Sequence, residues 1–131
     1  MATNAEKAIE IWKGLQGKPE GTGEWLKVEQ SRINTFADAT LDHQFIHVDP
    51  EKAAQLSPYK VTIAHGYLTL SLIPHLNAAI PIADPKGYEG IVMGVNYGLD
   101  KVRFPSPVQV NSRGRAHRVL VSAELVNPHT I

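Results

Sequence analysis

The sequence of 131 residues contains no cysteine, which excludes disulfide bonds, a zinc site with thiolate ligands and a cysteine nucleophile. It also has no excess of charge of either sign, because 13 Lys and Arg balance 13 Asp and Glu. The net charge therefore gives no reason to expect nucleic acid or an anionic membrane as a partner. No apolar run approaches the roughly 18 residues of a membrane-spanning helix, and the N-terminus lacks a secretory signal pattern. We therefore expect a cytoplasmic protein whose function resides in a local site.

The composition is that of one ordinary globular domain. Hydrophobic residues make up 43% and charged residues 20% of the chain, close to average usage and unlike a disordered protein. A chain of this length buries roughly two-thirds of the surface that it exposes when unfolded, which is enough for one core. Basic residues alternate within residues 113–118, a pattern more typical of a solvated strand face than of a nucleic-acid site. We predict a single domain without a nucleic-acid partner.

Signals for helix starts occur in the first half of the chain. Thr3 and Glu6 have the spacing of a capping box, and apolar residues follow at helical intervals. Asp49 followed by Pro50 predicts a second helix start, with Asp49 as the N-cap. Between these two helices, Ser31 is expected to cap a short helix that buries Ile33, Phe36 and Ala37.

The dominant predicted element is a helix over residues 66–80, which is apolar almost all round and is therefore expected to be a buried central helix. Pro74 lies inside it and is expected to kink it. Strands are predicted at residues 25–30, along residues 91–104 as one long strand, and within residues 108–126 as one strand or a bent pair. This order favours an α+β domain in which an antiparallel sheet wraps a single helix.

Asp42 and His47 are titratable residues in a segment without periodicity. Their spacing places them about 140° apart on a helix and on opposite faces of a strand, so they converge only if the backbone between them bends. His43 and His47 have the spacing of a helical zinc pair, but Phe45 and Val48 disfavour a helix and no glutamate follows His43. A catalytic pair, a metal site and a structural histidine all remain open on spacing alone.

Gly66 stands at the start of the predicted central helix, directly after His65. The first turn of a helix presents unpaired N–H groups and the positive end of the helix dipole. Glycine lets a ligand approach this backbone closely, so an oxygen that gains negative charge would be stabilised there, as in an oxyanion hole. The alternative is that Gly66 only eases the entry into a packed helix.

Together these two segments resemble a known family. The sequence has the pattern D-x4-H-x-D-P at residues 42–50 and continues with IAHGYLTLS at residues 63–71, as in the MaoC-like (R)-specific enoyl-CoA hydratases. The segment NYGLDKVRFPSPV at residues 96–108 resembles the NodN-like branch of that family. The resemblance covers roughly residues 24–126, and the two motifs together are far more specific than either alone.

The resemblance implies a hot-dog fold, in which a curved antiparallel sheet wraps a long central helix. It implies the reversible hydration of a trans-2-enoyl-CoA to a (3R)-3-hydroxyacyl-CoA, with no cofactor and no metal. Asp42 and His47 would hold and activate the water. We favour Asp42 as the base and His47 as the group that orients the water and returns a proton, although the two roles can be exchanged. Gly66, with His65 beside it, would bind the thioester carbonyl through its main-chain N–H.

Two further expectations concern what the protein binds. A homodimer is expected, because the apolar central helix needs more cover than one short sheet supplies and pairing two sheets edge to edge would supply it. Lys101 and Arg103 lie two residues apart on one face of the predicted long strand and are expected near the phosphates of CoA. Arg113 or Arg115 would supplement them.

The sequence also departs from the family pattern. Leu41 stands where a glycine usually precedes the catalytic Asp, and Gly114 stands where an apolar residue is usual. The chain ends at Ile131, whereas family members normally continue through further strands. We therefore expect a single MaoC-like hot-dog domain over residues 1–131 that lacks some C-terminal strands of the sheet.

Two other functions fit the same resemblance. An acyl-CoA thioesterase on the same fold would direct water at the carbonyl carbon and release free CoA. A non-catalytic acyl-thioester binding protein would bind acyl-CoA with no loss of enoyl absorbance.

Overall fold

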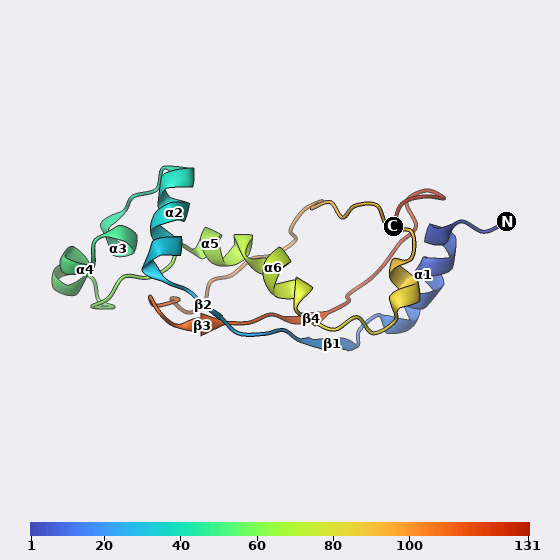
Figure 1. The fold of residues 1–131 in the computed structure, drawn as a ribbon, viewed down its shortest axis with the longest axis horizontal. Coiled ribbons are helices and arrows are strands. Elements are labelled where there is room, and N and C mark those ends of the chain that lie inside the picture. The colour runs from blue at the N-terminus through green and yellow to red at the C-terminus, as the bar shows by residue number, and fades with distance from the viewer.

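The computed structural model describes residues 1–131 and contains both helices and strands (Figure 1). The helices are α1 (Asn4–Leu15), α2 (Gln30–Thr40), α3 (Phe45–Val48), α4 (Pro50–Leu56), α5 (Gly66–Ser71), α6 (Ile73–Ala78) and the 3-10 helix η1 (Pro85–Tyr88). The strands are β1 (Pro19–Thr22), β2 (Leu26–Lys27), β3 (Arg113–Gly114) and β4 (His117–Val119). The molecule is elongated, with α2, α3 and α4 at one end and α1 with both termini at the other (Figure 1).

The strands form two small antiparallel sheets between residues 19–27 and residues 113–119. β1 pairs with β4, and β2 pairs with β3. The gap between the sheets is bridged by the main-chain N–H of Gly23, which donates to the carbonyl of Ala116 at 2.8 Å. The result is a single two-stranded ribbon that runs along the molecule and connects its two ends (Figure 1).

The local signals for helix starts are largely confirmed. Thr3 and Glu6 form both hydrogen bonds of a capping box at the start of α1. The side chain of Asp49 accepts from the main-chain N–H of Lys52, with Pro50 as the first residue of α4. The prediction that Ser31 caps a helix is wrong, because α2 already begins at Gln30 and its N-cap residue makes no side-chain hydrogen bond.

The long central helix predicted over residues 66–80 is divided into α5 and α6. Leu72 is both the C-cap of α5 and the N-cap of α6, and Pro74 lies in the first turn of α6. Proline has no N–H to donate and crowds the preceding turn, which explains why the interruption falls here. α6 has no buried residue. The long central helix and a sheet wrapped around it are therefore not confirmed.

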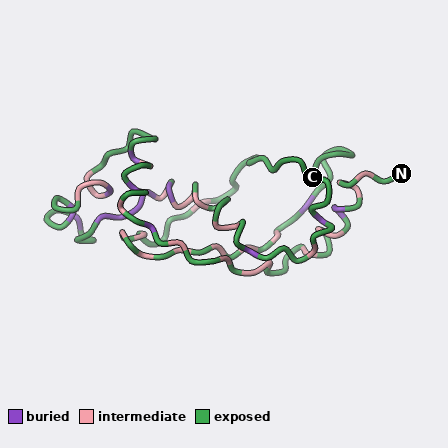
Figure 2. Tube along the Cα trace, in the orientation of Figure 1, coloured by how far each residue is buried: buried purple, intermediate pink, exposed green.

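The prediction of one long strand over residues 91–104 is wrong. No main-chain N–H or carbonyl in residues 92–107 hydrogen-bonds to another main-chain group. Most side chains of this segment are exposed, and its tube is almost entirely green in Figure 2. Alternating apolar residues describe a segment suited to a sheet, but a strand forms only where a second segment offers hydrogen bonds. No such segment lies beside residues 92–107.

The core is small and lies next to α2 and α5. Only 16 of the 131 residues are buried, so the short sheets do not enclose a large interior. One core cluster holds Val28, Ile33, Ala64 and Leu68, and Phe36 and Val108 pack against it. This confirms that α2 buries Ile33, and it fixes α2 against the start of α5. None of the helices has the length and hydrophobicity needed to span a bilayer.

Candidate active site

Asp42 lies in the short loop between α2 and α3. The preceding residue, Leu41, is the C-cap of α2 and has left-handed dihedral angles of φ 64° and ψ 26°. This conformation ends the helix and turns the chain, and glycine adopts it without steric cost. Residues 42–44, between this turn and α3, belong to no helix or strand, which is the irregular loop that convergence of Asp42 and His47 requires. The glycine that the resemblance leads us to expect at position 41 would adopt this backbone conformation without strain.

His47 lies on α3 and is 7% exposed. Its Nδ1 is 2.7 Å from the main-chain carbonyl oxygen of Ile63. Because a carbonyl oxygen can only accept a hydrogen bond, Nδ1 carries the proton, and Nε2 of the neutral ring keeps its lone pair. The hydrogen bond also fixes the orientation of the ring.

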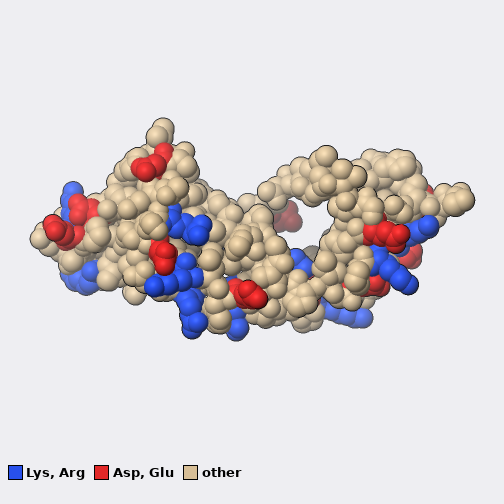
Figure 3. Space-filling model, viewed as in Figure 1, with Lys and Arg blue, Asp and Glu red and all other residues tan.

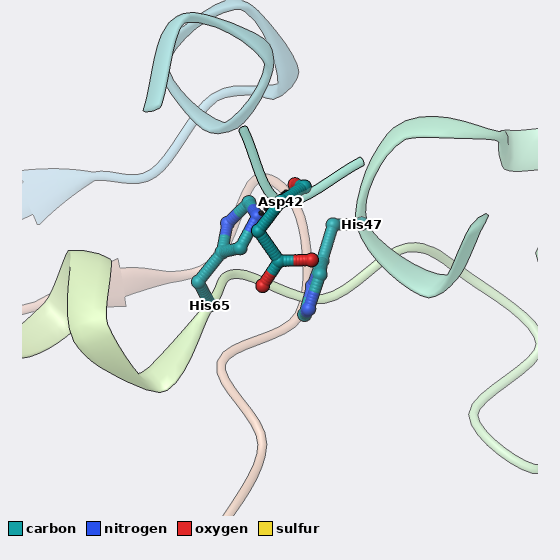
Figure 4. Close-up of side chains that lie close together, drawn as sticks. All are labelled: Asp42, His47 and His65. Atoms are coloured by element: carbon teal, nitrogen blue, oxygen red, sulfur yellow. Dashed lines mark hydrogen bonds between the residues drawn. The ribbon is translucent and has the colours of Figure 1, made fainter. Parts of the chain in front are cut away.

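Three titratable side chains meet at this place (Figure 4). One ligand atom of each of Asp42, His47 and His65 lies within 4.8 Å of the other two. The carboxylate of Asp42 is on the exposed side of the group, whereas both histidines are buried. One oxygen of that carboxylate accepts from the main-chain N–H of Gln44 at 3.3 Å. A carboxylate oxygen and the imidazole nitrogens of two buried histidines thus lie within 4.8 Å of one another, with the carboxylate facing solvent.

The two imidazole rings are not arranged to share a metal ion. The rings of His47 and His65 are stacked, with centroids 3.8 Å apart and planes inclined by 24°. An ion must lie close to the plane of each ring that binds it, and two nearly parallel planes do not meet within a bond length of zinc, about 2.0–2.1 Å. In addition, Nε2 of His65 is 3.0 Å from the carbonyl oxygen of Asp42. It must donate there, so this nitrogen has no lone pair for an ion.

Gly66 begins α5, directly after His65. Its main-chain N–H has no main-chain acceptor within the chain, as expected for the first residue of a helix. The ring of Phe104 packs against Gly66 so closely that an added Cβ would lie 2.8 Å from the nearest ring carbon. Tyr67 meets the same ring edge to face, with centroids 6.2 Å apart. A side chain at position 66 would therefore have to displace the ring of Phe104.

The other predicted site residues lie on the surface. Lys101 and Arg103 are exposed and belong to the segment without strand hydrogen bonds, so they do not share the strand face that was predicted. The contact between Phe104 and Gly66 nevertheless places this basic segment next to the start of α5. His43 pairs with Asp38 at 2.8 Å on an exposed surface.

A second set of contacts lies behind His47 and could not be found from the sequence. The side-chain amide of Gln30 donates to the main-chain carbonyl of His47 at 2.7 Å and to Asn34 at 2.9 Å. The hydroxyl of Thr62, which is 1% exposed, donates to the amide oxygen of Gln30. Gln30 is 17 positions from His47 and 32 positions from Thr62, so no local spacing pattern could have revealed these two contacts.

Residues 13–130 match the family profile described as "MaoC like domain". The chain belongs to the MaoC-like domain family. Across 115 residues, this MaoC-like chain is 46% identical to 3-hydroxyacyl-thioester dehydratase Z of Mycobacterium tuberculosis, an alignment that covers 88% of this chain and 72% of that protein.

The chain is also similar to proteins named Nodulation protein N. It is 55% identical over 104 residues to that of Rhizobium leguminosarum bv. viciae, covering 79% of this chain and 62% of the relative. It is 50% identical over 111 residues to that of Rhizobium meliloti, covering 85% of this chain and 66% of the relative. The chain thus spans slightly less than two-thirds of these nodulation proteins. The expected place in the MaoC-like family, close to its NodN-like branch, is confirmed.

Proposed function

We propose that this MaoC-like chain is a hydro-lyase that reversibly adds water to a trans-2-enoyl-CoA to give a (3R)-3-hydroxyacyl-CoA. The observation that carries the proposal is the convergence of the Asp42 carboxylate and the His47 ring, with Nδ1 of His47 occupied by the Ile63 carbonyl. The similarity to a 3-hydroxyacyl-thioester dehydratase supports the same class of reaction.

The proposed reaction begins with a water held between the two side chains. The water donates one hydrogen to the Asp42 carboxylate and the other to Nε2 of His47, which leaves a lone pair of its oxygen free for C3 of the substrate. As the C3–O bond forms, the water's O–H bond breaks and its proton moves to Nε2. The electron pair of the C2–C3 double bond moves toward the thioester oxygen, and the proton then passes to C2. Each proton transfer of this kind contributes about 10²- to 10⁴-fold.

This assignment makes His47 the proton acceptor and Asp42 the orienting group, which is the second of the two arrangements that the resemblance allows. Nδ1 of His47 already donates to Ile63, so only Nε2 can accept the proton of the water. The imidazolium that forms would be stabilised by the Ile63 carbonyl and by the nearby carboxylate. No cofactor enters these steps.

Gly66 is the proposed donor to the thioester oxygen. Its main-chain N–H has no main-chain acceptor in the chain, and it directly follows His65, which contacts both Asp42 and His47. A donor positioned before the reaction stabilises the enolate-like charge as it develops.

Lys101 and Arg103 are the proposed partners of the CoA phosphates. They lie beside Phe104, which packs on Gly66. Arg113 and Arg115 are the proposed supplements. Their guanidinium groups lie 5.3 and 4.2 Å from the ring centroid of Trp25, and basic side chains gather along the lower edge of the molecule near β2 and β3 (Figure 3).

We propose that the protein works as a homodimer with a completed hot-dog sheet. Residues 92–107 expose unpaired main-chain groups, the feature that lets a strand pair with another chain. The same segment exposes large apolar side chains, namely Val92, Met93, Val95, Tyr97 and Leu99. Light scattering should give the mass of a dimer at micromolar concentrations. A compact monomer across that range would contradict the proposal.

The decisive experiment follows the enoyl absorbance of crotonyl-CoA and of a longer enoyl-CoA after addition of the protein, together with an assay for free thiol. The proposed function predicts loss of enoyl absorbance without release of thiol. Thiol release would instead indicate a thioesterase, and tight acyl-CoA binding with unchanged absorbance would indicate a binding protein.

A further inference from the structure

His65 contacts both residues of the proposed catalytic pair. Its Nε2–H donates to the main-chain carbonyl oxygen of Asp42 at 3.0 Å. Its ring stacks on that of His47 at 3.8 Å between centroids. The ring of Phe36 lies 4.9 Å from it and is tilted by 58°. The imidazole of His65 is thus held by two rings and by the loop that carries Asp42 (Figure 4).

The segment that carries His65 is itself fixed. The N–H of Ile63 donates to the carbonyl of Ile46 at 2.9 Å, and the N–H of Ala64 donates to that of Val108 at 2.8 Å. The carbonyl of Ile63 receives Nδ1–H of His47. Residues 63–65 therefore hold His47 through one hydrogen bond and Asp42 through another, so the relative position of the two side chains depends on this segment.

His65 occupies this place at a cost to stability. It is 3% exposed, and its Nδ1 is buried without any hydrogen-bond partner. In Figure 4, one ring nitrogen of His65 lies near Asp42 and the other points away from it. A buried polar atom without a partner destabilises the folded state, and it calls for an explanation other than packing. The hydrogen bond to Asp42 and the stacking on His47 supply that explanation.

We propose that His65 is a positioning residue, which sets the distance between Asp42 and His47 and has no direct contact with the substrate. The inference rests on the proposed hydratase function of the pair. It replaces the expectation that His65, like Gly66, binds the thioester. Misplacement of a catalytic group by about 1 Å can lower the rate about 100-fold, so loss of this contact should act on kcat rather than on KM.

The test compares His65→Phe with His65→Gln in crotonyl-CoA hydration. Phenylalanine keeps an aromatic ring in the core but has no donor for the Asp42 carbonyl, whereas glutamine keeps an N–H donor. We expect His65→Phe to lower kcat about 10- to 100-fold with KM changed less than about threefold. Its thermal midpoint should stay equal or rise, because the unpartnered Nδ1 is removed. His65→Gln should recover part of kcat. His43→Gln is the matched control, since His43 pairs only with Asp38 on the surface.

Three results would overturn the proposal. The first is a His65→Phe variant that retains more than half of the wild-type kcat. The second is a His65→Phe variant with a raised KM and an unchanged kcat, as expected for a residue that contacts the substrate. The third is a loss of kcat in both variants that matches their loss of folded protein. A wild-type protein that leaves crotonyl-CoA unchanged would instead overturn the proposed function.

The position of His65 can be tested without activity. Nitrogen spectra of the imidazoles should place the proton of His65 on Nε2 and that of His47 on Nδ1. The main-chain amide signals of Asp42 and Gln44 should shift in His65→Phe and stay unchanged in His75→Gln, a substitution at an exposed position of α6. A proton on Nδ1 of His65, or unshifted signals in His65→Phe, would contradict the positioning role.

Discussion

Nδ1 of His47 donates a 2.7 Å hydrogen bond to the carbonyl oxygen of Ile63, 16 residues away in the chain. This bond joins α3 to the segment that leads into α5, and it fixes which nitrogen of the ring is free. A base whose second nitrogen is held by a third group is the usual arrangement of a histidine that accepts a proton in catalysis. The nucleophile here would be a water rather than a side chain.

Loss of either member of the pair should remove most of the activity. We expect Asp42→Asn and His47→Gln each to lower kcat about 10²- to 10⁴-fold, because the orienting carboxylate or the proton acceptor is lost while the side-chain volume is nearly kept. Residues that act as a unit are strongly non-additive, so the double variant should be little worse than either single one. Steady-state hydration of crotonyl-CoA measures all three variants.

The histidine on the neighbouring surface is the control for this series. His43→Gln should keep wild-type kcat, since its side chain bonds only to Asp38. A chelator should have no effect on the wild type. If Asp42→Asn kept at least about a tenth of wild-type kcat, the proposed role of the carboxylate would be untenable.

Replacing Leu41 by glycine should stabilise the protein. Leu41 has a φ of 64° and is 83% exposed, so its side chain contributes little packing that could offset the backbone strain. The left-handed conformation costs roughly 1–2 kcal/mol for a residue with a Cβ. Glycine removes this cost, but its greater backbone entropy in the unfolded chain destabilises the folded state by roughly 0.5–1 kcal/mol. We expect Leu41→Gly to raise the free energy of unfolding by about 0.5–1 kcal/mol in denaturant titration.

Leu56→Gly is the matched control for that change. Leu56 is the last residue of α4 and is 64% exposed, but it lies in a right-handed helix. Glycine is unfavourable there, so the unfolding free energy should fall by up to about 1 kcal/mol. Equal effects of the two substitutions would show that the strain at Leu41 is not the cause.

The close packing of Phe104 on Gly66 should appear as coupling between the two positions. A Cβ at position 66 would lie 2.8 Å from the ring, so Gly66→Ala should displace Phe104 and destabilise the protein. In Phe104→Ala the space is open, and the same change at Gly66 should be nearly neutral. A double-mutant cycle of unfolding free energies should give a coupling of about 0.5–3 kcal/mol. Additive effects would argue against the contact.

The basic residues beside Phe104 should act on substrate binding alone. We expect the double variant Lys101→Ala/Arg103→Ala to raise KM for crotonyl-CoA several-fold with little change in kcat, because the phosphates are remote from the reacting bond. Added salt should reduce the difference between wild type and variant, since exposed charges are screened. An unchanged KM would exclude these two residues as the phosphate site.

The parts of the structure that the sequence predicts correctly depend on interactions between residues close together in the chain. The capping box of Thr3 and Glu6, the start of α4 at Asp49 and Pro50, and the break near Pro74 all follow from local hydrogen bonds and sterics. The spacing of Asp42 and His47 allows their convergence only through an irregular loop, and it does not by itself decide between a catalytic, a metal-binding and a structural role.

The parts that could not be predicted depend on distant segments. The partners of His65 and Gln30 are 17 to 32 residues away, and no spacing pattern encodes them. The alternation of apolar residues in residues 91–104 indicates that this segment is suited to a sheet. It does not indicate which other segment would pair with residues 91–104. Ser31 has the chemistry of a cap, but the chain turns into the helix before it is reached.

The absence of main-chain hydrogen bonds in residues 92–107 has a consequence for isotope exchange. Amide protons exchange with deuterium only when they are free of an acceptor, and most amides in a folded domain must first wait for a local opening. The amides of this segment need no opening, so their exchange in a dilute sample should approach the rate of an unstructured peptide. Pairing with a second chain would protect them. Deuterium uptake in peptides from residues 92–107, followed by mass spectrometry as protein concentration rises, would therefore report assembly at this segment.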